Sequence, residues 1–138
     1  MIQEDYVSFE VAKLLKDKGF NEATNRYYNA QYDGIRTVSD TFMTYWNNEN
    51  HMKGLMMEGA IAIPTLQMAM KWLREVHNIH IVIKIVIRTY GDTEYYYELY
   101  GTKNKSLCVV CDIYNGESWG SSEEACEAAL KYVLENLI

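Results

Sequence analysis

The sequence Gly116-Glu-Ser-Trp-Gly120 has the spacing of a nucleophile elbow, the tight turn that presents a catalytic serine in many hydrolases. The chemistry would be attack of the Ser118 hydroxyl on an ester or amide carbonyl, and it requires a histidine as base. In that class of hydrolase the histidine follows the serine, whereas here every histidine precedes it: His51, His77 and His80. Ser121 is expected to cap the next helix, which leaves Ser118 in a connecting turn. We therefore expect Ser118 to be chemically inert.

Two of the three cysteines, Cys108 and Cys111, have the C-x-x-C spacing of zinc and redox pairs. Both fall on an expected strand, where residues three apart point to opposite faces, so their sulfur atoms would not converge. The sequence has no second C-x-x-C pair. Because the cysteine count is odd and fits a reducing compartment, we expect all three, Cys126 included, to be free thiols.

Two further spacings resemble binding motifs, and each lacks a required residue. His77 and His80 could supply two metal ligands, but no third ligand lies near them at a recognisable spacing. The segment Gly54–Gly59 has the glycine spacing of a phosphate loop, but Ala60 and Ile61 replace the lysine and the hydroxyl residue that such a loop needs. The sequence therefore predicts no metal site and no cofactor.

Tyrosine is the most unusual feature of the composition, with twelve residues in a chain of 138. If the odd positions of three expected strands face the helices, the opposite face carries a set of polar and aromatic side chains: His80, Lys84, Arg88, Tyr96, Glu98, Tyr100, Asp112 and Tyr114. Tyrosine combines apolar area and a polar hydroxyl with little entropy to lose, which suits recognition. The candidate binding residues are Arg88, Tyr96, Tyr100 and Tyr114.

This face is open to three interpretations. It could be a solvated sheet face held by cross-strand aromatic and ionic pairs. It could bind a protein or a small ligand without catalysis, which is the function that we expect. As an alternative, His80 and a carboxylate on the same face could form the acid–base pair of a small enzyme.

The elements that must position these residues follow from caps, turns and hydrophobic spacing. Ser8 and Gly19 bracket an amphipathic stretch and predict a helix over 9–18, while Asp33-Gly34 predicts a hairpin turn. The other expected elements are strands 26–28 and 35–38, a helix over 65–77, strands 79–87, 95–100 and 107–114, and a helix over 121–137. Residues 39–63 have no clear period, and we expect a long surface loop there.

The strand over 79–87 has the clearest pattern, because isoleucine occupies all five odd positions while His80, Lys84 and Arg88 lie on the other side. Such alternation predicts one buried face and one partly wet face. The chain has one proline and no Gly/Ser-rich linker, which favours a single domain over residues 1–138. The expected fold is α+β, a mainly antiparallel sheet with helices packed on one face, in the order α-β-β-α-β-β-β-α.

The composition is that of a folded protein, with 49% hydrophobic and 23% charged residues. Thirteen basic and nineteen acidic residues give a net charge of −6, which argues against a large phosphate-binding surface. The segment from residue 65 to 137 has the α-β-β-β-α order of a double-stranded-RNA-binding domain, a further alternative. Where such domains place basic residues, this chain has Ser121-Ser-Glu-Glu124, so nucleic acid is not an expected partner.

The N-terminal residues carry an acidic pair, Glu4-Asp5, where a secretory signal would have positive charge. The densest apolar stretch, Ile79–Ile87, is interrupted by His80 and Lys84 and is too short to span a bilayer. We expect a cytoplasmic protein that does not use a membrane as partner. The sequence gives no oligomeric state.

Three segments resemble one known family, in the same order along the chain: Val7–Phe20 (VSFEVAKLLKDKGF), Pro64–His80 (PTLQMAMKWLREVHNIH) and Ser122–Ile138 (SEEACEAALKYVLENLI). Together they are similar to the small uncharacterised proteins found in bacteriophages and prophages of gut bacteria. The resemblance covers about a third of the chain and brings no catalytic motif. It implies a phage-related accessory protein that works in a bacterial cytoplasm.

Overall fold

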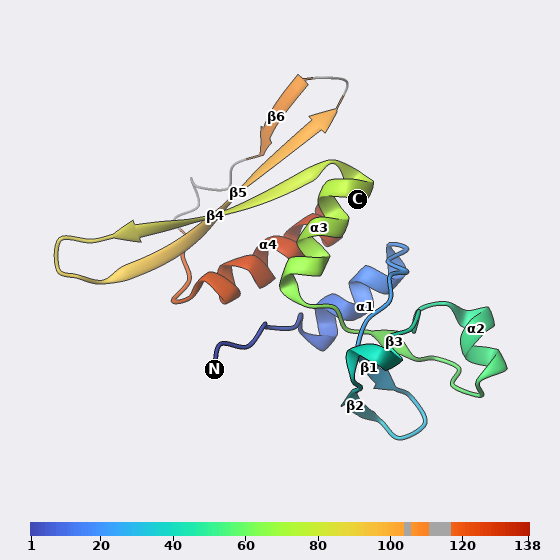
Figure 1. The fold of residues 1–138 in the computed structure, drawn as a ribbon. Helices are drawn as coiled ribbons and strands as arrows, with labels where there is room; N and C mark the ends of the chain where they lie inside the picture. The colour runs from blue at the N-terminus through green and yellow to red at the C-terminus, as the bar shows by residue number, and fades with distance from the viewer. Residues whose placement is uncertain (104–105, 111–116) are drawn as a thin grey trace. The chain divides into compact units, whose positions relative to one another are not determined.

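The computed structural model describes residues 1–103, 106–110 and 117–138 (Figure 1). The chain forms two compact units, Met1–Thr65 and Leu66–Ile138, and each is described by itself. Helices and antiparallel sheets occur together, which confirms the α+β class. The single domain over residues 1–138 stays a prediction.

The first unit begins with helix α1, Phe9–Asp17, whose ends agree with the sequence. The Ser8 hydroxyl accepts the backbone N–H of Val11 at 3.2 Å and caps the first turn. Gly19 has a φ of +91°, which reverses the chain so that the N–H of Phe20 bonds to the carbonyl of Leu15 at 2.9 Å. Phe20 is buried, with 1% of its surface exposed.

A small antiparallel sheet of order β2-β1-β3 completes this unit. Its strands are β1 (Arg26–Asn29), β2 (Gly34–Thr37) and β3 (Ile61–Ala62). Asn29 pairs with Gly34, and Asp33 takes a φ of +46° in the turn between β1 and β2. The hairpin predicted around Asp33-Gly34 is confirmed.

The expectation of a surface loop over 39–63 is wrong. The segment contains a short 3₁₀ helix η1 (Asp40–Phe42), helix α2 (Glu49–Gly54) and β3, and several of its side chains are buried. Trp46 stacks on Tyr27 with ring centroids 3.7 Å apart, and its indole N–H donates to the Thr24 carbonyl at 2.7 Å. Met52 is 1% exposed. The segment therefore supplies part of the core of its unit.

The second unit packs two helices on one face of an antiparallel sheet of order β4-β5-β6, as Figure 1 shows. The helices are α3 (Leu66–His77) and α4 (Ser122–Asn136), and the strands are β4 (Ile79–Ile87), β5 (Thr93–Lys103) and β6 (Ser106–Val110). Asn78 leaves α3 with a φ of +56°, and the Ser121 hydroxyl caps α4 by accepting the N–H of Glu124 at 3.1 Å. Both helix ends agree with the sequence.

The face of β4 and β5 that meets the helices, here called the inner face, is buried only along part of its length. Ile81 is 6% exposed and Leu99 1%, but Ile85 is 51% and Ile87 71% exposed. The expectation that all five isoleucines are buried is therefore wrong for the last two. Figure 1 shows the reason, because the β4–β5 hairpin extends past the end of α4.

Strand β6 pairs with β5 in a register that is shifted by one residue from the expected one. Odd positions of all three strands would share a face only if Leu99 paired with an odd-numbered residue. Instead Leu99 pairs with Val110, and Tyr100 pairs with Val109. Asp112 and Tyr114, which were expected on the polar face, lie outside the described residues.

Candidate binding surface on the β4–β5 hairpin

The register of β4 and β5 defines a second face, opposite the helices, here called the outer face. His80 pairs with Tyr100, Lys84 with Tyr96, and Val86 with Glu94. Residues that pair directly share a face of an antiparallel sheet, and faces alternate along each strand. The outer face therefore consists of the even-numbered residues where the two strands pair, together with Arg88, whose N–H bonds to the Asp92 carbonyl just past the end of β4: His80, Val82, Lys84, Val86, Arg88, Glu94, Tyr96, Glu98 and Tyr100.

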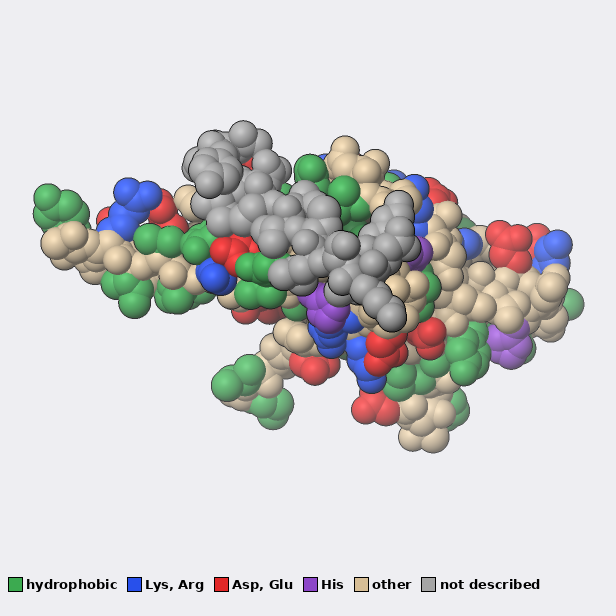
Figure 2. All heavy atoms as spheres, turned by 90° about the horizontal axis from the view of Figure 1, so that it is seen from above, with side chains coloured by type: hydrophobic (Ala, Val, Ile, Leu, Met, Phe, Trp, Pro, Cys, Tyr) green, Lys and Arg blue, Asp and Glu red, His purple; other side chains and the backbone are tan. Residues whose placement is uncertain are grey.

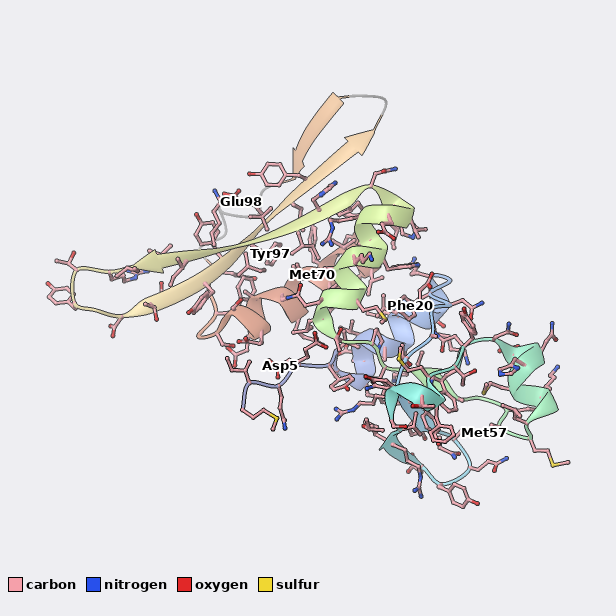
Figure 3. The ribbon with its side chains drawn as sticks, viewed as in Figure 1. Asp5, Phe20, Met57, Met70, Tyr97 and Glu98 are labelled. Carbon is pink, nitrogen blue, oxygen red and sulfur yellow. The ribbon has the colours of Figure 1, made fainter. Side chains whose placement is uncertain are left out.

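A cluster of three polar side chains, the Glu98 cluster, lies at the middle of the outer face. The Tyr100 hydroxyl donates to Glu98 Oε2, and Lys84 Nζ lies 3.3 Å from the same oxygen. Glu98 is only 6% exposed, although it lies on the outer face. Figure 3 shows Glu98 and Tyr97 on opposite sides of β5, with Tyr97 toward the helices. The cluster therefore holds a buried carboxylate between two strands.

The cluster keeps both of its ionisable ends charged. The hydrogen bond from Tyr100 and then the contacts with Lys84 lower the pKa of Glu98, against the opposing effect of desolvation. The hydrogen bond and charge of Glu98 raise the pKa of Lys84. A carboxylate with a lowered pKa and an ammonium with a raised pKa form an ion pair near neutral pH, and neither is tuned to transfer a proton there.

A second ion pair lies where the hairpin turns. Arg88 directs Nε and Nη2 at Glu94 Oε2, at 3.1 and 2.7 Å. Figure 2 shows basic and acidic side chains in contact near the end of the projecting hairpin, with hydrophobic side chains on either side of them. Both cations of the outer face, Lys84 and Arg88, are thus paired with carboxylates of the same face.

The structure places three of the predicted binding residues on the outer face but does not bring them to one point. Tyr100 pairs with His80, and Arg88 lies eight residues after His80 in the chain. Tyr100 and Arg88 are therefore roughly 26 Å apart along the hairpin. Tyr96 lies between them, opposite Lys84. The fourth residue, Tyr114, lies outside the described residues. Arg88, Tyr96 and Tyr100 therefore form a row and not a pocket.

The residues that the sequence did not single out are Lys84 and Glu98. Both were placed on the polar face, but their pairing depends on the register, which sets them diagonally because Lys84 pairs with Tyr96 and Glu98 with Val82. Counting back from a Gly91-Asp92 turn would not have given this register. The loop consists of residues 89–91, because the N–H of Arg88 bonds to the Asp92 carbonyl at 2.9 Å and Gly91 takes a φ of +84°.

A shallow cavity of about 540 Å³ lies beside the hairpin, between residues 91–94 and residues 118–120. Ser118 is exposed there, next to Trp119, which exchanges two backbone hydrogen bonds with Tyr95. His80 pairs with Tyr100, five residues along β5 and roughly 16 Å from Tyr95. The structure therefore brings no histidine of the outer face to Ser118.

The two histidines of the H-x-x-H spacing do not converge on a metal site. His77 packs edge-on against Trp72 at 4.8 Å, and its buried Nε2 has no hydrogen-bond partner among the described residues. His80 is exposed on the outer face. Within residues 1–103, 106–110 and 117–138 there is no group of three side chains that could hold a metal ion.

Across the same described ranges, the helices are all too short or too polar to cross a membrane. Comparisons of the chain with protein-family models, with curated proteins and with solved structures found no match.

Proposed function

We propose that this protein acts by non-catalytic binding and that the outer face of β4 and β5 contacts a folded protein partner. The observation that carries the proposal is the Glu98 cluster. Its buried carboxylate fixes Lys84 and Tyr100 in one arrangement before any partner arrives. A surface that is already ordered loses less entropy on binding, which favours recognition.

The charges and apolar groups of this face fit a protein better than a nucleic acid. Phosphate binding needs cations that are free to release counterions, whereas Lys84 and Arg88 are held by Glu98 and Glu94. Val82 and Val86 are 37% and 39% exposed beside the tyrosines, which adds apolar area. Aromatic, aliphatic and internally paired charged side chains are typical of the centre and rim of protein interfaces.

The extent of the face also favours a protein over a small ligand. Its candidate residues are spread over roughly 26 Å along the hairpin. Small molecules bind in concave sites that bury most of their surface. A row of this length suits the larger footprint of a protein partner.

The biological setting of this proposal comes from the resemblance of three segments to small phage and prophage proteins. We propose on that basis that the chain is a phage-related accessory protein and that its partner is a protein of the bacterial cytoplasm. The resemblance includes α1, α3 and α4, so the surface proposed here lies on the strands between the matching helices.

The two alternatives have less support. An acid–base enzyme on the outer face would use His80 and a carboxylate, but Glu98 bonds to Tyr100 and Lys84, and Glu94 bonds to Arg88. An RNA-binding domain would present cations at the start of α4, where the first turn carries Glu123 and Glu124. These carboxylates would repel phosphate.

The test is capture of binding proteins from a bacterial lysate, followed by purification of the captured protein and measurement of its affinity for the isolated chain. Tyr96→Ala should weaken this binary complex about 5-fold to 150-fold, the loss typical of an interface tyrosine. The matched control is Tyr32→Ala, because Tyr32 is 71% exposed in the other unit and should not alter affinity. Equal affinities for wild type and Tyr96→Ala would contradict the proposed surface.

A further inference from the structure

Among the residues that the structure describes, the strand β4 has a free edge. It lies at the end of the β4-β5-β6 order, and its second side pairs with no strand among the described residues. A free edge presents backbone N–H and C=O groups that another strand can pair with. The side chains along this edge are the five isoleucines and the intervening residues of IHIVIKIVI.

The hydrogen bonds of β5 show which residues of β4 face this edge. Tyr95 donates to Trp119 at 2.9 Å and accepts from it at 2.8 Å, so its backbone groups point away from β4. Ile85, which pairs with Tyr95, is therefore at a non-hydrogen-bonded position and directs its own groups to the free edge. Because the direction alternates along a strand, the same holds for every odd position, and all five isoleucines present backbone groups to the edge.

The sequence of β4 is nearly symmetric about its centre. Moving outward from Ile83 in both directions gives isoleucine at each odd position, as the pairs Ile81 with Ile85 and Ile79 with Ile87. An antiparallel pair of identical strands is related by a two-fold axis, so residues equidistant from the centre lie opposite each other. The positions with unpaired backbone groups would then all pair, isoleucine with isoleucine.

We propose that a second copy of this chain pairs along the free edge of β4, antiparallel, with Ile83 opposite its counterpart at the two-fold axis. The pairing joins two three-stranded sheets into one continuous sheet. It leaves the outer face of both copies accessible and is independent of the binding function proposed above.

The burial of β4 is complementary in this arrangement. Ile81 is 6% exposed under the helices, whereas Ile85 is 51% and Ile87 71% exposed where the hairpin extends past them. Antiparallel pairing sets the uncovered end of each strand beside the covered end of the other. The exposed isoleucines would therefore lie next to the apolar region that the helices of the second copy already cover.

Charge disfavours one alternative register. β4 contains no acidic residue, and its one lysine, Lys84, is paired with Glu98 of its own chain. With Ile83 at the axis, each Lys84 lies opposite Val82 of the other copy. A shift that set the two Lys84 side chains directly opposite would place like charges together, which is unfavourable.

The small area of this proposed interface indicates a weak dimer. A nine-residue strand is about 30 Å long, and a sheet edge is about 10 Å thick, so pairing covers on the order of 300 Å² per copy. Stable complexes bury about 800 Å² per partner, and burial of the exposed isoleucine side chains supplies part of the difference. We therefore expect a weak dimer that forms as the protein concentration rises from the low micromolar to the millimolar range.

The test is sedimentation of the full chain over that concentration range, with Ile85→Lys as the disrupting variant. Wild type should rise from 16.1 kDa toward twice that mass, and Ile85→Lys should stay at 16.1 kDa. Ile35→Lys is the matched control, because Ile35 is 53% exposed on β2 and the same substitution there should leave the dimer intact. Both substituted side chains are exposed, so both variants should melt close to wild type.

Amide hydrogen exchange of the wild-type chain tests the pairing itself, without any substitution. The odd-numbered amides from Ile79 to Ile87 should exchange at least tenfold more slowly at high concentration, whereas the even-numbered amides should change little because β5 already protects them. Three results would overturn the proposal: a wild-type chain that stays monomeric, a dimer that Ile35→Lys but not Ile85→Lys disrupts, or a dimer whose odd-numbered amides gain no protection. If Ile85→Lys fails to fold, the exchange result decides.

Discussion

Lys84 Nζ lies 3.3 Å from the Glu98 oxygen that also accepts the hydroxyl of Tyr100. The two ions belong to different strands and are set diagonally, since Lys84 pairs with Tyr96 and Glu98 with Val82. The Lys84 side chain is 46% exposed and that of Glu98 only 8%. A single carboxylate oxygen therefore joins an exposed cation to a partly buried tyrosine across two strands.

The first prediction is that Glu98→Gln destabilises the protein at neutral pH and that this deficit shrinks in acid. Because the Tyr100 hydrogen bond and Lys84 lower the pKa of Glu98 below its ordinary value of 4.5, the folded state favours the ionised form more than the unfolded state does. The resulting stabilisation is complete above pH 4.5 and is lost as pH falls through the lower pKa of the folded state. Urea unfolding of both proteins from pH 7 to pH 2 measures the difference.

The control for this prediction is Glu58→Gln, because Glu58 is exposed and its loss should not produce the same pH dependence. Lys84 has a raised pKa, so its part of the interaction should persist up to its ordinary value of 10.5 and disappear only above it. A deficit for Glu98→Gln that is as large at pH 2 as at pH 7 would show that the lost interaction is not with an ionised carboxylate.

The second prediction concerns Trp46, in the segment that was expected to be a surface loop. Trp46→Ala should lower the free energy of unfolding by roughly 3–5 kcal/mol, because the indole is 6% exposed and stacks on Tyr27. Phe42→Ala, in the same segment, should cost less than about 0.5 kcal/mol because Phe42 is 70% exposed. Urea unfolding measures both. Equal costs would mean that residues 39–63 do not contribute to the core as described.

Local signals in the sequence predicted the elements that begin and end on a cap. Ser8, Gly19, Asn78 and Ser121 each have one steric or hydrogen-bonding role, and the structure places each in that role. Residues 39–63 could not be predicted in this way. Trp46 is a single buried side chain, held by the Thr24 carbonyl 22 residues earlier in the chain. It belongs to no periodic pattern of apolar residues, so spacing could not predict its burial.

The outer face was predicted in part, for a related reason. Alternation along β4 places His80, Lys84 and Arg88 on one side, so which residues of one strand share a face follows from counting. The register between β4 and β5 does not, because the loop consists of residues 89–91 and Asp92 bonds to Arg88. The length of β4 that is buried depends on where α4 ends, and the sequence of β4 itself does not contain that information. Ile85 and Ile87 therefore look identical to Ile81 in sequence, although their exposures are 51%, 71% and 6%.

The third prediction is that Cys126 is unreactive in the folded protein. Its Sγ lies 3.1 Å from Met70 Sδ, and burial, with Glu127 and Glu123 nearby, raises its pKa from 9.0 to about 12. That shift lowers the thiolate population at pH 8 about a thousandfold. Iodoacetamide at pH 8 should leave the peptide that contains Cys126 unmodified in the native protein and modify it fully in urea. Rapid modification of that peptide in the native state would contradict the described burial.

The last prediction tests the difference in burial along the β4–β5 hairpin. Leu99→Ala should cost roughly 2–5 kcal/mol of unfolding free energy, because Leu99 is 1% exposed and its loss leaves a cavity under the helices. Ile87→Ala removes the same number of carbon atoms, but from a side chain that is 71% exposed, and it should cost less than about 1 kcal/mol. Both should be measured by urea unfolding at low micromolar concentration, so that pairing between copies does not add to the cost. If Ile87→Ala is as damaging as Leu99→Ala in the dilute protein, the hairpin does not extend beyond its helices, and the inner face is buried along its whole length.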